Sequence, residues 1–312
     1  MRARIFVSLT IAGIAAVFGA TIAANVLVDP QGVFGSKLVT FHSNPNMRYQ
    51  ALRTYSRSPA AYDAVMFGSS RANAFDLEML AERFGVRGVV SFAVPFGLLS
   101  DHLPALEFLI RDQAQRGDPL KAVFLVLDPD FFGQQPWTNI NIDSFLPPPI
   151  GGATPVRFWW RYLTVLQFRN WRSDVRDALR GPHDEPAQPR LDLSSPVTLR
   201  PDLARQLSML ERFVTLCREH GIRLVAVTSP LSRTVAERHS GAQLDRVVEE
   251  IGRITPVWDF GRPAWLSERP EYWLDRGHYR PIVARMIVDR AFGLETSAPD
   301  DFGHLVGPSL TP

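Results

Sequence analysis

Cysteine is almost absent from this sequence: Cys217 is the sole example, so no intrachain disulfide can form. Cys217 lies in an amphipathic helical pattern and not in a turn that would expose a nucleophile, which favours a packed, unreactive thiol. Without disulfides the fold depends on its hydrophobic core. A chain of 312 residues with 46% apolar side chains is long and apolar enough to build one.

Signatures of several common chemistries are also missing. No glycine-rich phosphate loop ends in Lys-Ser or Lys-Thr, and no His-Glu-x-x-His motif occurs. The formal net charge is only +2 and there is no long basic block, which gives no reason to expect a nucleic acid partner. The sequence therefore predicts a function without metal, cofactor or nucleic acid.

Charged residues are absent from one long stretch, Ile5 to Val28, which follows Arg2 and Arg4. At about 1.5 Å per residue this run can cross a bilayer core of about 30 Å. The arginines favour a cytoplasmic N-terminus. We therefore expect a single-pass anchor in the inner (cytoplasmic) membrane, with the main domain in the periplasm or outside the cell. A signal peptide cleaved near residues 20–24 is the alternative, but the run continues without a clear small-residue cleavage site.

Composition divides the rest of the chain. A connector rich in proline and glycine leads to the main domain, which is interrupted by an irregular insertion. Within the insertion we expect an aromatic helix at 158–179 and a disordered, proline-rich linker at 181–201. A polar C-terminal tail is expected to be frayed. The predicted parts are an anchor (1–29), a connector (30–58), a domain (59–295) with its insertion at about 134–201, and a flexible tail (296–312).

Short apolar runs alternate with amphipathic helical patterns along the main domain. Asp76 and Gly85, for example, have the properties of an N-cap and a stop for the helix between them. Such alternation predicts an α/β fold with a parallel sheet covered on both faces. In these sheets ligands bind beyond the carboxyl ends of the strands. The predicted strands are 64–67, 88–94, 122–127, 223–227 and 256–260.

The first predicted strand runs into a short polar turn, Gly68-Ser-Ser-Arg71. A strand that ends in Gly-x-Ser and leads into a helix is a known way to expose a nucleophilic serine beside free backbone N–H groups. We take Ser70 as the candidate nucleophile. The residues alone also allow an alternative to a nucleophile, in which Ser69 and Ser70 act only as a helix N-cap.

A serine hydroxyl needs a base to take its proton, and Asp275-Arg-Gly-His278 supplies a candidate pair. His278 would be the base, and Asp275 is close enough in sequence to orient its imidazole. The backbone N–H groups of Ser70 and Gly97 are candidate oxyanion donors, since glycine allows a substrate to approach the backbone closely. The alternatives are a local cap or surface pair for Asp275 and His278, and an ordinary turn at Gly97.

The motifs Phe67-Gly-Ser-Ser-Arg71 and Asp275-x-x-His278 resemble those of the SGNH (GDSL-like) hydrolase superfamily. The chain looks most like its membrane-anchored branch of alginate O-acetyltransferase-like and teichoic-acid D-alanylation-like proteins, over residues 60–135 and 205–293. The resemblance implies a flavodoxin-like three-layer α/β/α sandwich with a parallel sheet, preceded by the transmembrane helix. It assigns the nucleophile to Ser70 and the second-block glycine to Gly97. The implied chemistry is ester hydrolysis or acyl transfer through a serine-bound acyl group.

One block departs from the family pattern. The third block usually carries an asparagine that completes the oxyanion hole, whereas the matching strand end reads Leu127-Asp-Pro-Asp-Phe-Phe132. A carboxylate there would repel an oxyanion, and losing one donor costs about 3–4 kcal/mol of transition-state stabilisation. Asp128 is then either structural or a contact for substrate hydroxyls. Arg71 could replace the missing donor, or it could form an ion pair with Asp128 or Asp130.

Two functions are consistent with these patterns. In the first, the chain is a serine esterase or O-acyltransferase, with acetyl as the expected group, acting on a cell-envelope or exported polysaccharide. Transfer would also require a membrane-bound partner that carries acyl groups outward. In the second, the fold has lost catalysis and serves as a binding or scaffold module of an envelope assembly. The missing asparagine favours the second function, whereas the retained Ser70, Asp275 and His278 favour the first.

Overall fold

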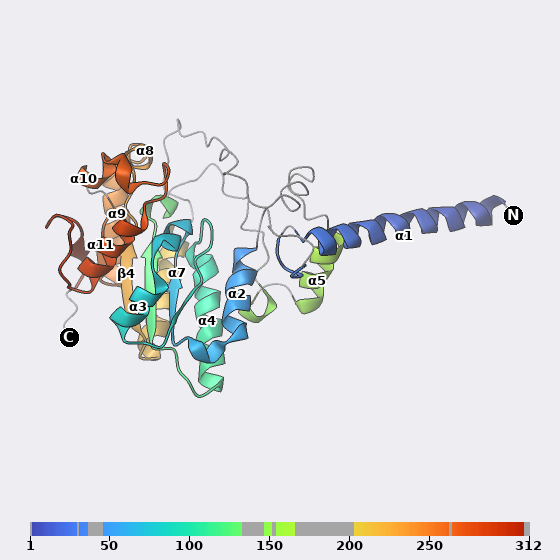
Figure 1. Ribbon diagram of the computed structural model, residues 1–312, viewed down its shortest axis with the longest axis horizontal. Coiled ribbons are helices and arrows are strands. Elements are labelled where there is room, and N and C mark those ends of the chain that lie inside the picture. Colours follow the sequence, from blue (N-terminus) through green and yellow to red (C-terminus); the bar gives the residue numbers. More distant parts are fainter. Residues whose placement is uncertain are drawn as a thin grey trace. The chain divides into compact units, whose positions relative to one another are not determined.

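The computed structural model of the chain (Figure 1) describes residues 2–29, 31–36, 46–132, 147–151, 154–165, 203–261 and 264–308. The chain divides into two compact units, the first made of Met1–Gln50 and Ser144–Leu191, the second of Ala51–Asp143 and Asp192–Pro312. Much of the predicted insertion therefore shares a unit with the anchor. The linker predicted at 181–201 lies outside the described residues.

The first unit contains α1 (Arg2–Val28), one helix that runs unbroken through the predicted anchor and past the alternative cleavage region. It is long and apolar enough to cross a membrane, and no other helix of the described residues passes the same test. Its side chains are exposed along most of its length. An apolar helix exposed on all sides is suited to a lipid environment.

A short helix, α5 (Pro155–Thr164), belongs to the same unit. It begins earlier than predicted because the Thr154 hydroxyl accepts a hydrogen bond from the Arg157 N–H, and proline suits the first helical position. Its buried residues Phe158 and Tyr162 pack with Val33. The part of the predicted helix beyond residue 165 lies outside the described residues.

The second unit is built on a six-stranded sheet with strand order β2-β1-β3-β4-β5-β6. Neighbouring strands are parallel from β2 to β5, and β6 runs antiparallel to β5. The α/β fold with a mostly parallel sheet is thus confirmed, and the five predicted strands are present. The strands are β1 (Ala64–Phe67), β2 (Val89–Ser91), β3 (Ala122–Leu127), β4 (Arg223–Thr228), β5 (Val257–Asp259) and β6 (His304–Val306).

Helices alternate with these strands. The capping prediction for α3 is confirmed, since the Asp76 carboxylate accepts two backbone N–H groups and Gly85 adopts the left-handed conformation, with φ of 68°. Two helices, α8 and α9, follow β4. The helices are α2 (Met47–Arg57), α3 (Leu77–Phe84), α4 (Leu99–Gln115), α7 (Leu203–Glu219), α8 (Arg233–Ala236), α9 (Gly241–Ile254), α10 (Ala264–Ser267) and α11 (Pro281–Ala291).

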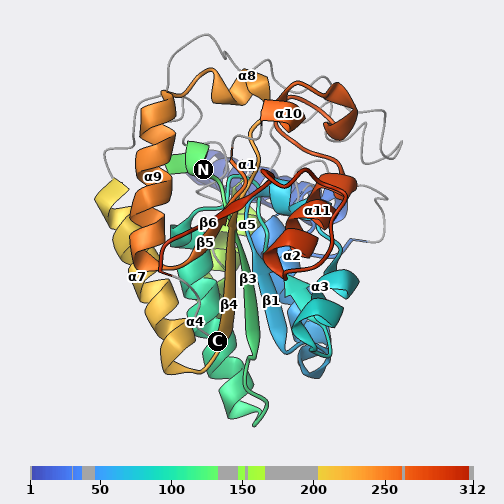
Figure 2. The ribbon, with the colours of Figure 1, turned by 90° about the vertical axis from the view of Figure 1, so that its left-hand side faces the viewer.

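Side chains of the central strands point alternately to the two faces of the sheet, as the period of a strand requires. Met66 shares a core cluster with Leu80 of α3 and Val283 of α11. Phe67, the next residue, instead contacts Phe213 of α7, with ring centroids 5.5 Å apart. Figure 2 shows α3 and α11 on one side of the sheet and α7 on the other. Every residue of β1 is buried, which explains why the strand reads as a continuous apolar run.

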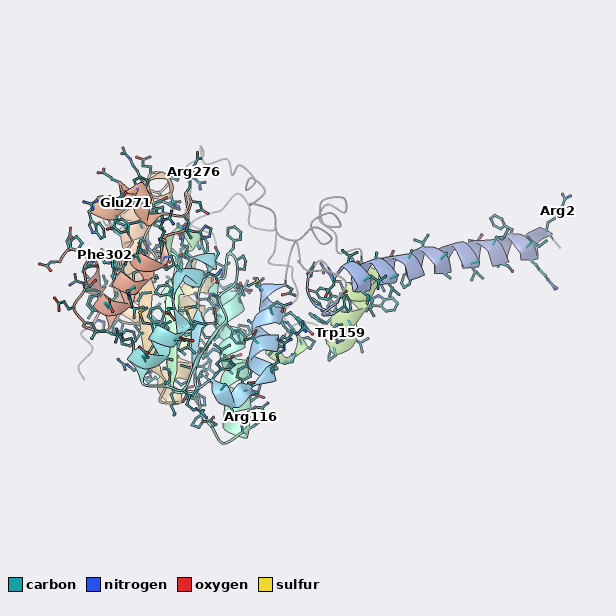
Figure 3. The ribbon with its side chains drawn as sticks, viewed as in Figure 1. Arg2, Arg116, Trp159, Glu271, Arg276 and Phe302 are labelled. Carbon is teal, nitrogen blue, oxygen red and sulfur yellow. The ribbon has the colours of Figure 1, made fainter. Side chains whose placement is uncertain are left out.

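The predicted frayed tail is wrong for residues 296–308, which the structure describes. Phe302, labelled in Figure 3, is fully buried in the core cluster that includes α11, and it packs on Phe260 with ring centroids 4.8 Å apart. Gly303, with φ of 82°, then turns the chain so that β6 pairs with β5. One large aromatic side chain therefore anchors a segment whose composition is polar.

Candidate active site

The turn after β1 separates the roles of its two serines. Ser69 is fully buried, and its hydroxyl accepts a hydrogen bond from the Arg71 N–H at 3.2 Å, which makes it the cap of a short 3₁₀ helix (Ser70–Ala74). Ser70 is partly exposed. The turn is tight: a Cβ at Gly68 would lie 2.7 Å from the Ala72 Cβ, closer than real Cβ atoms approach. The N-cap role predicted as an alternative thus belongs to Ser69.

Ser70, His278 and Asp275 form one hydrogen-bonded chain. Ser70 Oγ lies 2.8 Å from His278 Nε2, and His278 Nδ1 lies 2.8 Å from Asp275 Oδ2. With the proton on Nδ1 donated to the carboxylate, the Nε2 lone pair faces the serine hydroxyl, the arrangement that a general base requires. The structure therefore brings together three residues that are up to 208 positions apart in the sequence.

The loop that carries His278 is held in place by its own backbone. Leu274 N–H donates to His278 O at 2.8 Å, and Asp275 Oδ1 accepts from the N–H groups of Gly277 and His278 at 2.7 and 2.8 Å. Burial disfavours the charged form of Asp275, but the Gly277 N–H and the His278 ring outweigh it and lower the pKa of the Asp275 carboxyl. Asp275 is thus both a local cap and the partner of the ring, which combines the two interpretations left open by the sequence.

A second strand-end loop supports the same segment. The Ser232 hydroxyl, in the loop after β4, donates a hydrogen bond to the Arg276 carbonyl. The sequence predicts ligand-binding loops at the carboxyl ends of the strands, of which this is one, but it does not predict this contact. Ser232 is also the N-cap of α8, and the sequence of a capping serine does not indicate whether its hydroxyl makes a second contact.

The site lies where the strand order reverses. Ser70 follows β1 and Asp128 follows β3, and these two strands are neighbours although β2 comes between them in the sequence. Parallel α/β sheets commonly bind ligands at such a switch point, because the loops on its two sides diverge and leave an opening.

Arg71 and Asp128 have partners that differ from the predicted substrate contacts. Arg71 Nη1 donates to Asp128 Oδ1 at 2.9 Å and to Asp130 Oδ1 at 2.6 Å, and Nη2 donates to Asp130 Oδ2 at 2.8 Å. The side chains are 6%, 2% and 4% exposed, respectively. The ion pair considered as the alternative is therefore the one observed. Most of the guanidinium N–H groups thus point at protein acceptors, which favours the ion-pair role of Arg71 over the oxyanion contact.

The same guanidinium also reaches the loop that carries His278. Arg71 Nε donates to the Gly277 carbonyl at 2.9 Å, next to His278 in the chain. Burial disfavours the charged forms of Arg71 and Asp130, but their mutual attraction outweighs it, so the pKa of Arg71 is raised and that of Asp130 is lowered. Arg71 therefore links the turn that carries Ser70, the end of β3 and the loop that carries His278. The Gly277 contact was not predicted, because a backbone acceptor leaves no trace in the sequence.

Gly97 does not act as the predicted oxyanion donor in this conformation. Its N–H donates to the Val94 carbonyl at 2.8 Å and is part of a turn. A Cβ at this position would lie 2.7 Å from both Gly68 O and His102 Cε1, so glycine is needed for the close approach of two loops. The Ser70 N–H, in contrast, has no acceptor among the described residues and stays available as a donor.

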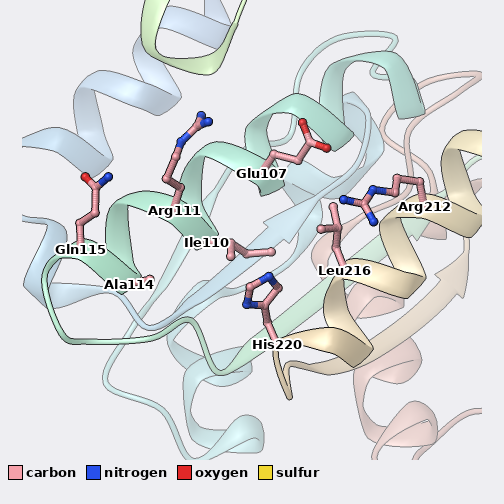
Figure 4. A pocket seen from close by; sticks show the side chains of 8 residues that line it. All are labelled: Glu107, Ile110, Arg111, Ala114, Gln115, Arg212, Leu216 and His220. Atoms are coloured by element: carbon pink, nitrogen blue, oxygen red, sulfur yellow. The ribbon is translucent and has the colours of Figure 1, made fainter.

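A hollow lies elsewhere on the second unit, between α4 and α7 (Figure 4). Its volume is about 710 Å³, and its charged lining includes Glu107, Arg111 and Arg212. It contains no serine, threonine or cysteine, so it offers no nucleophile. Because Gln115 and His220 of its lining directly precede the segments that enter β3 and β4, it lies toward the amino ends of the strands, opposite to Ser70.

Comparison with known proteins yields no assignment. No protein-family model matches the chain, and no curated protein shows significant similarity to it. The functional argument therefore depends on the geometry of the site.

Proposed function

We propose that this chain is a membrane-anchored serine esterase or O-acyltransferase of the SGNH type, which acts outside the cytoplasm on a cell-envelope or exported polysaccharide. The observation that carries the proposal is the hydrogen-bonded chain from Ser70 Oγ through His278 to Asp275. A partly exposed serine aligned with a base whose second nitrogen is held by a carboxylate is the arrangement of a nucleophilic catalyst.

The fold is consistent with this proposal. The order of the parallel strands, β2-β1-β3-β4-β5, is that of flavodoxin-like proteins. It supports the three-layer α/β/α sandwich that the family resemblance implies. Fold alone does not identify an activity, so the proposal depends on the hydrogen-bonded chain, which lies at the switch point of this sheet.

In the proposed mechanism, Ser70 Oγ attacks the carbonyl carbon of an acyl donor while its proton passes to His278 Nε2. The tetrahedral intermediate places its negative oxygen near the Ser70 N–H, and Asp275 stabilises the imidazolium. Collapse breaks the bond to the leaving group, which takes the proton from His278. Water or a sugar hydroxyl then attacks the acyl-serine with His278 as base, and the serine is restored.

The choice between hydrolysis and transfer depends on which acceptor reaches the acyl-serine. The polysaccharide, the acetyl group and a membrane-bound partner that supplies acyl groups are part of the proposal on the ground of the resemblance. The extracytoplasmic position is supported by α1, with Arg2 and Arg4 at its N-terminal end.

A non-catalytic scaffold is the second candidate, and one observation favours it. Arg71, Asp128 and the Gly97 N–H are all engaged with protein groups, which leaves the Ser70 N–H as the one oxyanion donor identified among the described residues. Each lost donor reduces turnover by about 10²- to 10³-fold. The experiment must therefore distinguish a slow enzyme from an inactive module.

The test uses the full chain in nanodiscs with a p-nitrophenyl acetate substrate. We expect release of nitrophenol and an acetyl adduct on Ser70 by mass spectrometry, both lost in Ser70→Ala, and release also lost in His278→Ala. Ser58→Ala is the matched control, because Ser58 is exposed and its hydroxyl caps nothing. Absence of both turnover and adduct in the unaltered chain would favour the scaffold.

A further inference from the structure

Helix α5 is fastened to the C-terminal part of α1. The Asn25 side-chain amide, fully buried, donates to the backbone carbonyls of Tyr162, Leu163 and Val165 at 3.0, 3.1 and 2.9 Å. These carbonyls belong to the last turn of α5 and the residue after it, which have no partner inside the helix. A polar residue inside the apolar run of α1 thus supplies hydrogen-bond donors to the carbonyls at the end of another helix.

A second contact lies deeper along α1. The rings of Phe18 and Trp160 are 5.9 Å apart between centroids. Figure 1 shows α5 running across the C-terminal end of α1 and not alongside its length, and Figure 3 places Trp159 of α5 beside that end. The two contacts therefore hold α5 across α1, at a defined position along the axis of α1.

The length of α1 limits how far α5 can lie from the hydrocarbon core of the bilayer. Its 27 residues extend about 40 Å, and a hydrocarbon core takes about 30 Å of that. If α1 spans the bilayer, at most about 10 Å, or about seven residues, can stand clear at one end. Phe18 lies further from Val28 than this, so it must be inside the hydrocarbon. Trp160, in contact with Phe18, cannot then be remote from lipid.

The surface of α5 suits such a position. Val156 is 79% exposed and Trp160 is 60% exposed, although both are apolar. The helix carries Arg157 and Arg161 and no acidic residue. Tryptophan concentrates at the membrane–water interface, and a short helix with aromatic and basic residues is typical of segments that lie in the interface of anionic membranes.

We propose that α5 is an interfacial membrane helix, which lies in the headgroup region of the leaflet that contains the C-terminal half of α1. The partner is the lipid surface itself. Asn25 has a specific role in this arrangement, because carbonyls without a donor are costly at membrane depth. The chain would then contact the bilayer through two elements from distant parts of the sequence, the anchor and a helix of the insertion.

The test measures the depth of a fluorescent label in nanodiscs that contain anionic lipid. A bimane label is attached at Val156→Cys of the full chain, in a Cys217→Ala background. Leu9→Cys in α1 serves as the membrane-buried reference, and Glu271→Cys, exposed in the second unit, serves as the comparison site. Quenching is measured with lipids that carry a nitroxide near the headgroup, with lipids that carry it deep in the chain, and with iodide in the water.

We expect the label at residue 156 to be quenched at least twofold more by the shallow nitroxide than by the deep one, with reduced access to iodide. Full iodide access with no lipid quenching would overturn the proposal and leave α5 on a water-exposed surface. Protection from iodide and from both lipid quenchers would also overturn it, because protein would then cover the helix. Val156 is exposed, so its replacement leaves the packing of α5 intact.

Discussion

The buried cluster of Arg71, Asp128 and Asp130 predicts a large loss of stability when the arginine alone is removed. In Arg71→Met the two carboxylates would remain buried without their counter-charge, since they are 2% and 4% exposed. Breaking a buried ion pair in this way costs about 3–5 kcal/mol. For a domain of this size, each kcal/mol lost from the free energy of unfolding lowers the melting temperature by about 2–4 °C. The melting temperature of Arg71→Met should therefore fall by about 6–20 °C.

The assay is thermal unfolding of the full chain in one detergent, followed by near-ultraviolet circular dichroism. Arg233→Met is the matched control, because Arg233 is 65% exposed and pairs with Glu237 on the surface of α8; its melting temperature should hardly change. The triple variant Arg71→Met, Asp128→Asn, Asp130→Asn should regain part of the loss, since it leaves no unpaired buried charge. If Arg71→Met melts like the control, the cluster does not stabilise the fold as argued.

The remaining predictions concern three other positions. Gly97→Ala should lower stability and acetyl release together, because its Cβ would lie 2.7 Å from Gly68 O; an active, stable variant would show that the loops can separate freely. Burial lowers the pKa of His239 more than Asp130 raises it, so this residue adds stability above its ordinary pKa of about 6.5, which is lost as the pH falls below that value. His239→Gln should therefore lose less melting temperature than the unaltered chain between about pH 7.5 and pH 5.5, and equal losses would contradict the argument. Asn25→Leu should remove the three hydrogen bonds that its amide donates to the end of α5, so that trypsin cleaves faster after the arginines of that helix; unchanged cleavage would mean that Asn25 does not hold α5.

The elements whose signals are local could be predicted from the sequence. Asp76 and Gly85 delimit α3 because the capping carboxylate and the left-handed glycine act on their own backbone. The strands β1 and β3 were predicted to the residue, because a strand covered on both faces is a continuous apolar run. Ser70 was preferred to Ser69 on the family resemblance, and the structure is consistent with that preference, because the Ser69 hydroxyl caps the short 3₁₀ helix.

Properties that depend on contacts between distant segments could not be predicted from the sequence. The partner of Arg71 was undecided between an oxyanion and two carboxylates, since composition does not reveal which groups share a buried volume. Gly97 was expected to point its N–H at a substrate, but a turn to Val94 takes that donor. The polar tail became a strand because Phe302 fills a core position that only the packed sheet creates.

By itself, the sequence determined the long apolar N-terminal helix, the α/β alternation and the three residues of the candidate triad, because each depends on the order, period or chemistry of neighbouring residues. Tertiary structure alone decided that His278 meets Ser70 and that Asn25 holds α5 against α1. The physical reason is the same in both cases: a hydrogen bond between segments more than a hundred residues apart depends on how the intervening chain packs, and that packing is a property of the whole fold.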